Sequence, residues 1–148
     1  MPQTGTITLT IDSRIDHVFL VGSAVNKICT AAALSEQEAY EAEVSVVEAV
    51  NNAIEHAYDN RAGHPVEVVV TVDNDRIVFQ VCDWGRTLEW TGERPPAPIV
   101  NADDTASLPE GGRGLFIMYA FTDAIDYRRR GAKNVLTLVK HVPRAQAA

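Results

Sequence analysis

Apolar and polar residues alternate in one short segment near the start of the chain, while two longer segments repeat their apolar positions every three or four residues. Alternation with period two is typical of a half-buried strand, and it occurs in residues 6–11. Residues 66–72, 77–82, 124–129 and 135–141 have strand-forming compositions. The sequence therefore predicts five strands, with a tight turn between the second and the third.

Helical periodicity covers residues 15–34 and, after a short break, residues 36–58. The second helix begins after Ser35, and Glu38 follows three residues later, which is the arrangement of a capping box. A short helix of about residues 115–121 is expected after a run of glycines. The order β-α-α-β-β-loop-α-β-β predicts an α+β fold, a two-layer α/β sandwich with helices on one face of a mostly antiparallel sheet.

Length and composition fit one domain that spans residues 1–148, with 46% hydrophobic and 22% charged residues. The formal net charge of −7 argues against a protein that mainly coats nucleic acid or an anionic membrane. Cys29 and Cys82 are interpreted as buried free thiols in a reducing compartment. The sequence has no signal-peptide pattern and no run that approaches the roughly 18 apolar residues of a membrane span. We therefore expect a cytoplasmic protein with no direct binding to nucleic acid or membrane.

One face of the second predicted helix carries side chains that could bind a ligand. Glu48, Asn52 and His56 follow one another at intervals of four residues, which places them on the same face. An asparagine can offer an oxygen to Mg²⁺ without adding charge, and a glutamate can orient or deprotonate a hydroxyl group or water. The spacing also fits the solvated face of an ordinary amphipathic helix. For His56, a packing role at the helix end is the better interpretation.

Two glycine-containing motifs and a long loop follow this helix. Asp83 and Gly85 end a predicted strand, and residues 111–114 place three glycines at a helix start, where N–H groups and the helix dipole favour an anion. Between them, residues 86–110 are polar and broken by prolines, which fits a mobile lid over a ligand or a surface insertion. Each motif alone is weak evidence, because Asp and Gly are common in turns and glycines also form hinges.

Taken in order, these motifs resemble the Bergerat-fold (GHKL) ATP-binding superfamily, the histidine-kinase-like ATPase domains of gyrase, the Hsp90 chaperones, histidine kinases and MutL. Residues 48–58 resemble its N box, residues 83–85 its G1 box and residues 112–114 its G2 box. More specifically, the residues of the N and G2 boxes resemble those of the bacterial anti-sigma factor serine/threonine kinases. The resemblance covers about residues 6–142.

The resemblance implies a role for each matched residue. Glu48 would be the general base, or would position the attacking hydroxyl, and Asn52 would coordinate the Mg²⁺ that links the ATP phosphates. Asp83 would accept a hydrogen bond from the adenine amino group, and Gly85 would let the backbone approach the ring. The phosphates would be cradled by three residues of the G2 box: Gly112, Arg113 and Gly114.

The function implied is that of an ATP-binding anti-sigma factor and serine/threonine kinase. It would bind a sigma factor or similar target and phosphorylate a STAS-type antagonist in a partner-switching system, and it could form a homodimer. An alternative is a nucleotide-gated protein-binding module without kinase activity. Glu110 motivates this alternative, because better-studied kinases of the family carry an arginine just before the glycines, and a glutamate repels a polyphosphate.

Overall fold

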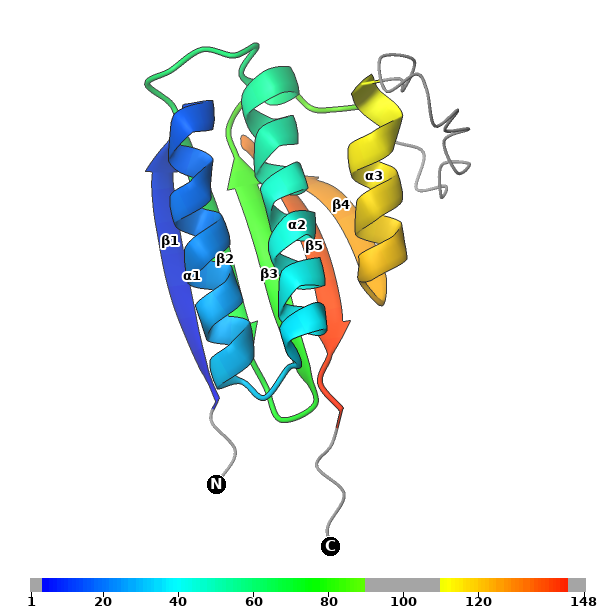
Figure 1. Cartoon of the computed structure of the whole chain (residues 1–148). Helices are drawn as coiled ribbons and strands as arrows, with labels where there is room; N and C mark the ends of the chain where they lie inside the picture. Colours follow the sequence, from blue (N-terminus) through cyan, green and yellow to red (C-terminus); the bar gives the residue numbers. More distant parts are fainter. Residues whose placement is uncertain (1–3, 90–109, 144–148) are drawn as a thin grey trace, which may run out of the picture.

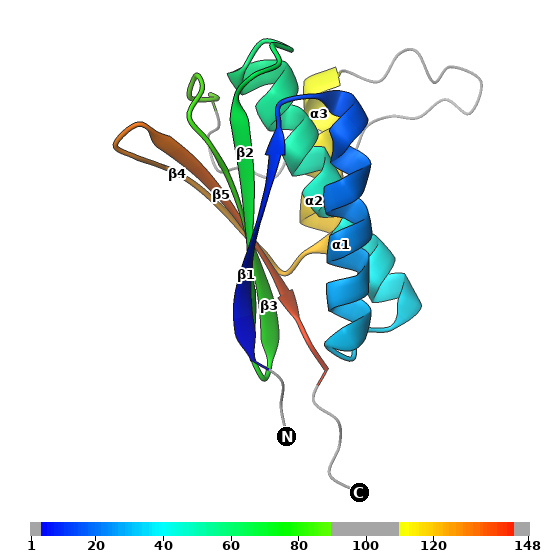
Figure 2. The same ribbon diagram turned by 90° about the vertical axis from the view of Figure 1, so that its left-hand side faces the viewer.

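An antiparallel sheet with helices on one of its faces makes up the part of the chain that the computed structural model describes, residues 4–89 and 110–143 (Figures 1 and 2). Its five strands pair in the order β1-β2-β3-β5-β4, and all neighbouring strands run antiparallel. The strands are β1 (Gly5–Asp12), β2 (Pro65–Val72), β3 (Arg76–Asp83), β4 (Ala124–Arg130) and β5 (Lys133–His141). The five predicted strands are therefore confirmed, with bounds that differ by one or two residues.

Within the described residues, three α-helices cover the sheet, and Figure 2 shows them on the same side of it. They are α1 (Val18–Ala31), α2 (Glu36–Asn52) and α3 (Glu110–Phe121). A 3₁₀ turn (Ile15–His17) leads into α1. The predicted capping box is confirmed, because Glu38 N–H donates to Ser35 Oγ and Ser35 N–H donates to Glu38 Oε1, both at 3.1 Å. The α+β sandwich predicted from the sequence is thus confirmed.

The hydrophobic core lies between the sheet and the helices. Alternate residues of β3 are buried, because successive side chains of a strand point to opposite faces of the sheet: Ile77, Phe79 and Val81. They belong to one cluster with Val46 and Val50 of α2, which are fully buried. Burying each such side chain stabilises the fold by about 1.5–3 kcal/mol. This packing holds the apolar side of α2 on the sheet and so fixes where its polar side points.

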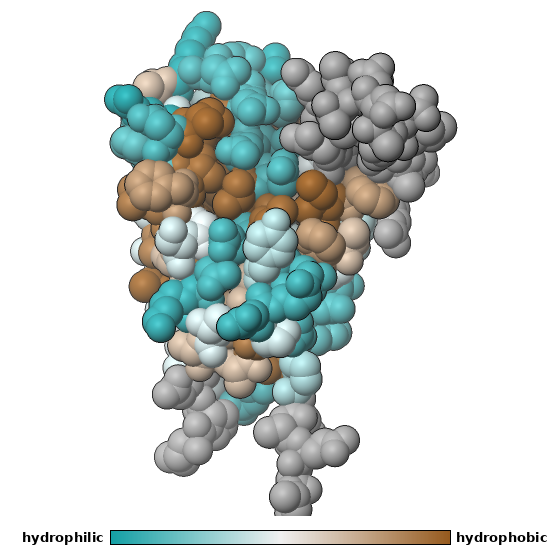
Figure 3. Space-filling view, viewed as in Figure 1, coloured by the Kyte–Doolittle hydropathy of each residue, from teal (hydrophilic) through white to brown (hydrophobic). Residues whose placement is uncertain are grey.

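The helical face of the molecule also exposes several apolar side chains (Figure 3). Three of them lie close together at the N-terminal end of α1 and in the turn before it, where Ile15, Phe19 and Leu20 have exposed fractions of 47%, 65% and 53%. This end of α1 is therefore not covered by the described part of the chain.

Two further expectations concern membrane spans and cysteines. In the described ranges, 4–89 and 110–143, none of the helices has the length and apolar character needed to cross a membrane. Cys29 and Cys82 are both buried and free, as predicted. Burial raises the pKa of the Cys29 thiol to about 12, so this thiol stays protonated near neutral pH.

The second predicted helix, residues 36–58, differs from the prediction in its last part. Regular α-helix ends at Asn52, and Ala53–Ala57 form a π-helical turn in which the Tyr58 N–H donates to Ala53 O at 3.0 Å. The wider turn brings the Ala57 carbonyl to the segment after β3, where it accepts the Arg86 N–H at 2.9 Å. Apolar periodicity along the chain does not contain this tertiary contact, so the sequence predicted an uninterrupted helix.

The third predicted helix begins earlier than expected, at Glu110 instead of near residue 115. The glycines of residues 111–114 therefore form its first turns instead of preceding it, which corrects the prediction. Glycine is a poor helix former, but it permits a close approach between helices, and α3 packs against α2 at Gly114. Of the predicted lid, residues 86–110, only residues 86–89 and the helix start at 110 lie within the described part; residues 90–109 lie outside it.

Candidate functional site

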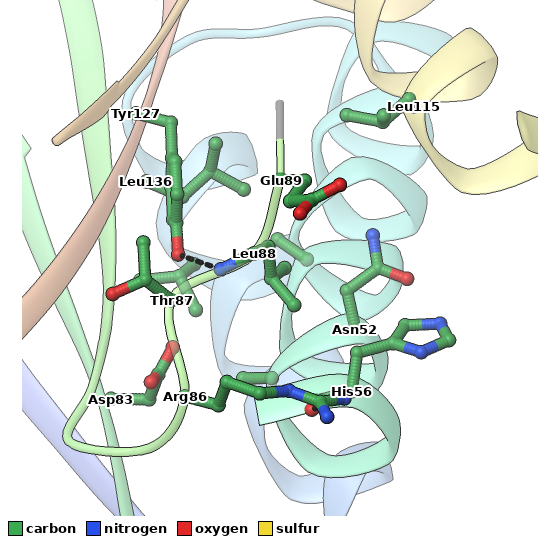
Figure 4. A pocket seen from close by; sticks show the side chains of 13 residues that line it. Asn52, His56, Asp83, Arg86, Thr87, Leu88, Glu89, Leu115, Tyr127 and Leu136 are labelled. Atoms are coloured by element: carbon green, nitrogen blue, oxygen red, sulfur yellow. Dashed lines mark hydrogen bonds between the residues drawn. The ribbon is translucent and has the colours of Figure 1, made fainter. Parts of the chain in front are cut away.

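A cavity of about 490 Å³ lies between the C-terminal part of α2, the end of β3 and the β4–β5 pair (Figure 4). A volume of this size suits a small-molecule ligand. Apolar and polar side chains both line it: Ala49, Asn52, Ala53, His56, Val81, Asp83, Arg86, Thr87, Leu88, Glu89, Leu115, Tyr127 and Leu136. Such a lining fits a flat, mostly apolar ring with polar groups at its edge.

Asp83 is a buried acceptor at the edge of this cavity. It ends β3, its exposed fraction is 4%, and its Oδ1 accepts hydrogen bonds from Asn134 Nδ2 at 2.8 Å and from the Gly85 N–H at 3.0 Å. Burial raises the pKa of the Asp83 carboxyl, and these two hydrogen bonds together with the positive charge of Arg129 oppose that rise. Among the described residues, no donor is hydrogen-bonded to Asp83 Oδ2. The second oxygen is therefore free to receive a donor from a ligand.

Gly85 brings the segment after β3 into contact with the end of the α2 helix. A Cβ atom at this position would lie 2.4 Å from the Ala57 carbonyl oxygen, which is backbone and cannot move aside. Only glycine fits this approach. The neighbouring Trp84 N–H donates to the Tyr58 hydroxyl at 2.8 Å, and that hydroxyl donates to Pro65 O at 2.7 Å. The direct role of Gly85 in the structure is thus to dock this wall of the cavity on the helix, and its contact with a ring remains a prediction.

Glu48 and Asn52 lie one helical turn apart beside Gly114 of α3. A Cβ atom on Gly114 would lie 3.1 Å from Glu48 Oε2 and 3.4 Å from Asn52 Nδ2. Asn52 lines the cavity, and both side chains are half-buried. The fold therefore brings the carboxylate of Glu48 and the amide of Asn52 together with Gly114.

The other two G2 residues, Gly112 and Arg113, lie in the first turn of α3. The first four N–H groups of a helix have no partner within it and attract anions. Because α3 begins at Glu110, those groups belong to residues 110–113.

His56, interpreted from the sequence as a packing residue, is half-buried and lines the cavity, and its carbonyl accepts a hydrogen bond from Arg86 Nη2 at 3.1 Å.

Sequence reasoning missed the residues that surround Asp83 from the β4–β5 pair. Asn134 is fully buried and lies directly opposite Asp83 in the β3–β5 ladder. Arg129 and Tyr127 come from β4, and the Tyr127 hydroxyl accepts the Leu88 N–H at 3.0 Å. The only signal in the sequence was a polar residue at the start of a strand, which by itself does not show that the strand pairs with β3.

The fold, the residues around the cavity and the match to a known family together identify the class of this protein. A helix-covered antiparallel sheet, with a buried carboxylate at a strand end and an acidic and an amide side chain beside a glycine-rich helix start, is the architecture of a nucleotide-binding domain. The chain belongs to the histidine kinase-like ATPase domain family, whose model matches residues 11–140. Membership of this family implies the use of ATP.

Curated relatives make the comparison more specific. The serine-protein kinase RsbW of Halalkalibacterium halodurans is 26% identical over 143 residues, covering 96% of this chain and 86% of the relative. The protein of the same name from Bacillus pumilus is 25% identical over 132 residues, covering 87% of this chain and 82% of the relative. The resemblance to serine/threonine kinases that the sequence motifs indicated is thereby confirmed.

A solved structure supports the fold. The crystal structure of the RsbU and RsbW domains of Rv1364c from Mycobacterium tuberculosis superposes with a TM-score of 0.60 and 16% identity. The match covers 98% of this chain and 35% of that chain. At this identity the comparison concerns the fold alone, and it agrees with the predicted α+β class.

Proposed function

We propose that this protein is an ATP-dependent serine/threonine protein kinase and anti-sigma factor of a partner-switching system. One observation carries the proposal: the cavity lined by the buried acceptor Asp83 extends to Asn52 of α2, and the Asn52 side chain lies with that of Glu48 beside Gly114 of α3. The first end suits a base that carries an amino group. The second end suits the phosphates and the reacting hydroxyl.

At the base end, Asp83 would accept a hydrogen bond from the adenine amino group, while Gly85 holds the adjacent wall. Apolar side chains of the lining, Val81, Leu115 and Leu136, would contact the faces of the ring. Such a division between an apolar body and a few fixed polar groups is usual in small-molecule sites.

At the phosphate end, the residues present fit a magnesium nucleotide. The described residues contain no group of three or more His, Cys, Asp or Glu that could hold a metal ion by themselves. Mg²⁺ in nucleotide sites is commonly held by one or two protein oxygens, with phosphate and water oxygens as its other ligands. Asn52 Oδ1 would be the protein ligand, Gly112, Arg113 and Gly114 would cradle the phosphates, and a bound magnesium ion would neutralise phosphate charge.

Phosphoryl transfer requires a nucleophile and a group that takes its proton. The hydroxyl oxygen of a target serine or threonine would form a bond to the γ-phosphorus while the bond from that phosphorus to the ADP oxygen breaks. Glu48, beside Asn52 and Gly114, would position the hydroxyl and accept its proton. The curated relatives' name, serine-protein kinase, supports this reaction.

The proposed partners are a sigma factor or similar target and a STAS-domain antagonist, with a homodimer as the proposed assembly. Phosphorylation adds about −1.5 to −2 charges to the antagonist, which is sufficient to weaken a protein interface. We also propose that residues 1–148 form one domain with a lid at about residues 86–110.

The first test is calorimetric titration of the full chain with ATP, with and without Mg²⁺. We expect binding that Mg²⁺ strengthens and that Asn52→Ala weakens. The same chain is then incubated with γ-labelled ATP and purified STAS-domain proteins of the same organism. Label should appear on a serine or threonine of one of them and should be lost with Glu48→Ala. Glu55→Ala, which changes an exposed carboxylate in the π-helical turn after α2, should keep the label.

The alternative, a nucleotide-gated binding module without phosphoryl transfer, is motivated by Glu110. It predicts nucleotide-dependent complexes with a partner but no labelled product. Loss of label in Glu48→Ala with retained ATP binding would exclude this alternative. If the folded chain binds no ATP, both functions are wrong.

A further inference from the structure

A fully buried amide, Asn134, connects the acceptor Asp83 to the positive charge of Arg129. Asn134 Nδ2 donates to Asp83 Oδ1 at 2.8 Å and to Gly85 O at 3.1 Å. Its Oδ1 accepts from Arg129 Nη1 at 3.2 Å and from Thr87 Oγ1 at 3.1 Å. Both ends of the amide are therefore occupied, and its exposed fraction is 0%.

The surroundings allow only one orientation of this amide. A guanidinium nitrogen can only donate, and a carbonyl or carboxylate oxygen can only accept. If the amide were rotated by 180°, its NH₂ group would face Arg129 and its oxygen would face Asp83 and Gly85 O. All three contacts would then be repulsive, so Arg129 on one side and Gly85 O on the other fix the NH₂ group toward Asp83.

This orientation divides the two oxygens of Asp83 between protein and ligand. Oδ1 receives two donors, Asn134 Nδ2 and the Gly85 N–H. In the described part of the chain no donor is bound to Oδ2, and Figure 4 shows Asp83 at the edge of the cavity beside Thr87. In its ionised form, a carboxylate held in this way presents an acceptor to the edge of a base.

We propose that Asn134 and Arg129 are positioning residues that make the site select a purine with a 6-amino group over a purine with a 6-oxo group. The inference rests on the proposed nucleotide site and names the residues that set its base specificity. A 6-amino group donates to Asp83 Oδ2, whereas a 6-oxo group would place one acceptor against another, with no donor available.

Substitution of the acceptor itself gives the sharpest test. In Asp83→Asn the same two donors, Asn134 Nδ2 and the Gly85 N–H, require the new side chain to direct its oxygen toward them. Its NH₂ group must then take the place of Oδ2 and face the base. The variant should therefore lose the preference for a 6-amino purine and gain affinity for a 6-oxo purine.

ATP and ITP are suitable probes, because the 6-amino group of adenine is a 6-oxo group in hypoxanthine and the sugar and phosphates are the same. Calorimetry on the full chain with Mg²⁺ should show that the wild type prefers ATP. Asn134→Leu should lower the ATP:ITP affinity ratio about tenfold or more, the effect of losing a hydrogen bond to a charged group. Asp83→Asn should bind ITP more tightly than the wild type does and ATP more weakly.

Substitutions of two neighbouring arginines distinguish an effect on the orientation of the Asn134 amide from a general effect of positive charge on nucleotide binding. Arg129→Met should lower the ATP:ITP ratio severalfold, because Gly85 O still holds the other end of the amide. Arg128→Met is the control, because Arg128 is exposed and paired with Asp126 at 2.8 Å, away from Asn134. The ratio, unlike either affinity alone, would not change if a variant only loosened the site.

The inference is overturned if ITP binds Asp83→Asn no better than it binds the wild type. It is also overturned if folded Asn134→Leu keeps the wild-type ratio. If Asn134→Leu fails to fold, the ATP and ITP affinities of Asp83→Asn and Arg129→Met decide whether the inference holds. A wild type that binds neither nucleotide would refute the proposed function itself, which is a different outcome from binding ATP without the predicted dependence on Asn134.

Discussion

Burial decides what Asp83 can do at the scale of a single residue. Its carboxyl is removed from water, so its pKa is raised, while Asn134, the Gly85 N–H and Arg129 oppose that rise. The protein therefore holds an ionisable group at a place where burial disfavours its ionisation. Such a placement is common at binding sites, where groups are arranged for a ligand rather than for the fold.

Asp83→Asn is expected to raise the free energy of unfolding of the ligand-free protein at neutral pH. An acid with a raised pKa in the folded state stabilises the fold below its unfolded pKa, and that contribution is lost as the pH rises through the folded pKa. The variant has no such group. Its free energy of unfolding should therefore exceed that of the wild type at pH 7.5, and this difference should be smaller at pH 4. Urea unfolding at both values measures it.

The control for this prediction is Asp75→Asn, which changes an exposed carboxylate in the β2–β3 turn. In Asp75→Asn, the free energy of unfolding should change between pH 7.5 and pH 4 by the same amount as in the wild type. A lower stability of Asp83→Asn at pH 7.5 would show that ionised Asp83 stabilises the fold, contrary to the argument from burial.

At the scale of elements, the contact between α2 and α3 depends on the absence of a side chain at Gly114. A methyl group there would lie 3.1 Å from Glu48 Oε2, which is the far end of a flexible side chain. The corresponding contact at Gly85 is with backbone. The two glycines therefore differ: Gly85 is required by packing, while the surroundings of Gly114 can adjust.

Gly114→Ala is expected to leave stability unchanged within about 1 kcal/mol, because alanine favours a helix over glycine by a similar amount and Glu48 can move. Moving Glu48 displaces the proposed base, so the rate of phosphoryl transfer should fall about tenfold or more. Urea unfolding and the labelling assay measure the two effects separately. Gly5→Ala, which has open space around the added methyl group, is the control.

A stability loss in Gly114→Ala well beyond that of Gly5→Ala would mean that the α2–α3 contact cannot adjust. An unchanged labelling rate would mean that Glu48 need not keep its position, and it would weaken the assignment of Glu48 as the base.

At the scale of the whole molecule, Lys140 joins three elements. Its Nζ donates to Phe121 O at the end of α3 at 2.7 Å and lies 3.4 Å from Glu41 Oε1 of α2, while the residue itself belongs to β5. The side chains of Lys140 and Glu41 are only 11% and 21% exposed. This ammonium group therefore links the C-terminal end of α3 to the sheet and to α2.

Lys140→Met should lower the free energy of unfolding by about 1–3 kcal/mol, because it leaves a mostly buried carboxylate and a helix-terminal carbonyl without their donor. Adding Glu41→Gln should recover part of the loss, since it removes the unpaired charge. Urea unfolding of the two variants measures both effects. Equal stability of Lys140→Met and the wild type would show that this link contributes nothing.

The elements of the fold were well predicted by local patterns. Alternation of apolar residues located β1, strand-forming composition located the other strands, and the Ser35–Glu38 capping box located the start of α2, because all three signals depend only on neighbouring residues. The spacing of Glu48 and Asn52 likewise placed them on one helix face before any tertiary contact was known. The early start of α3 and the π-helical turn at Ala53–Ala57 were not predicted, because each is fitted to a neighbouring element.

The sequence by itself therefore determined the class of fold, the family and the chemical types at the site, since these follow from periodicity and from motifs in a fixed order. The tertiary structure decided which hydrogen bonds those groups make and in which direction they point. Strand pairing placed Asn134 opposite Asp83, and Arg129 on the next strand fixed the direction of its amide. Asn134 and Asp83 are 51 positions apart in the chain, and only the folded sheet brings them within hydrogen-bonding distance.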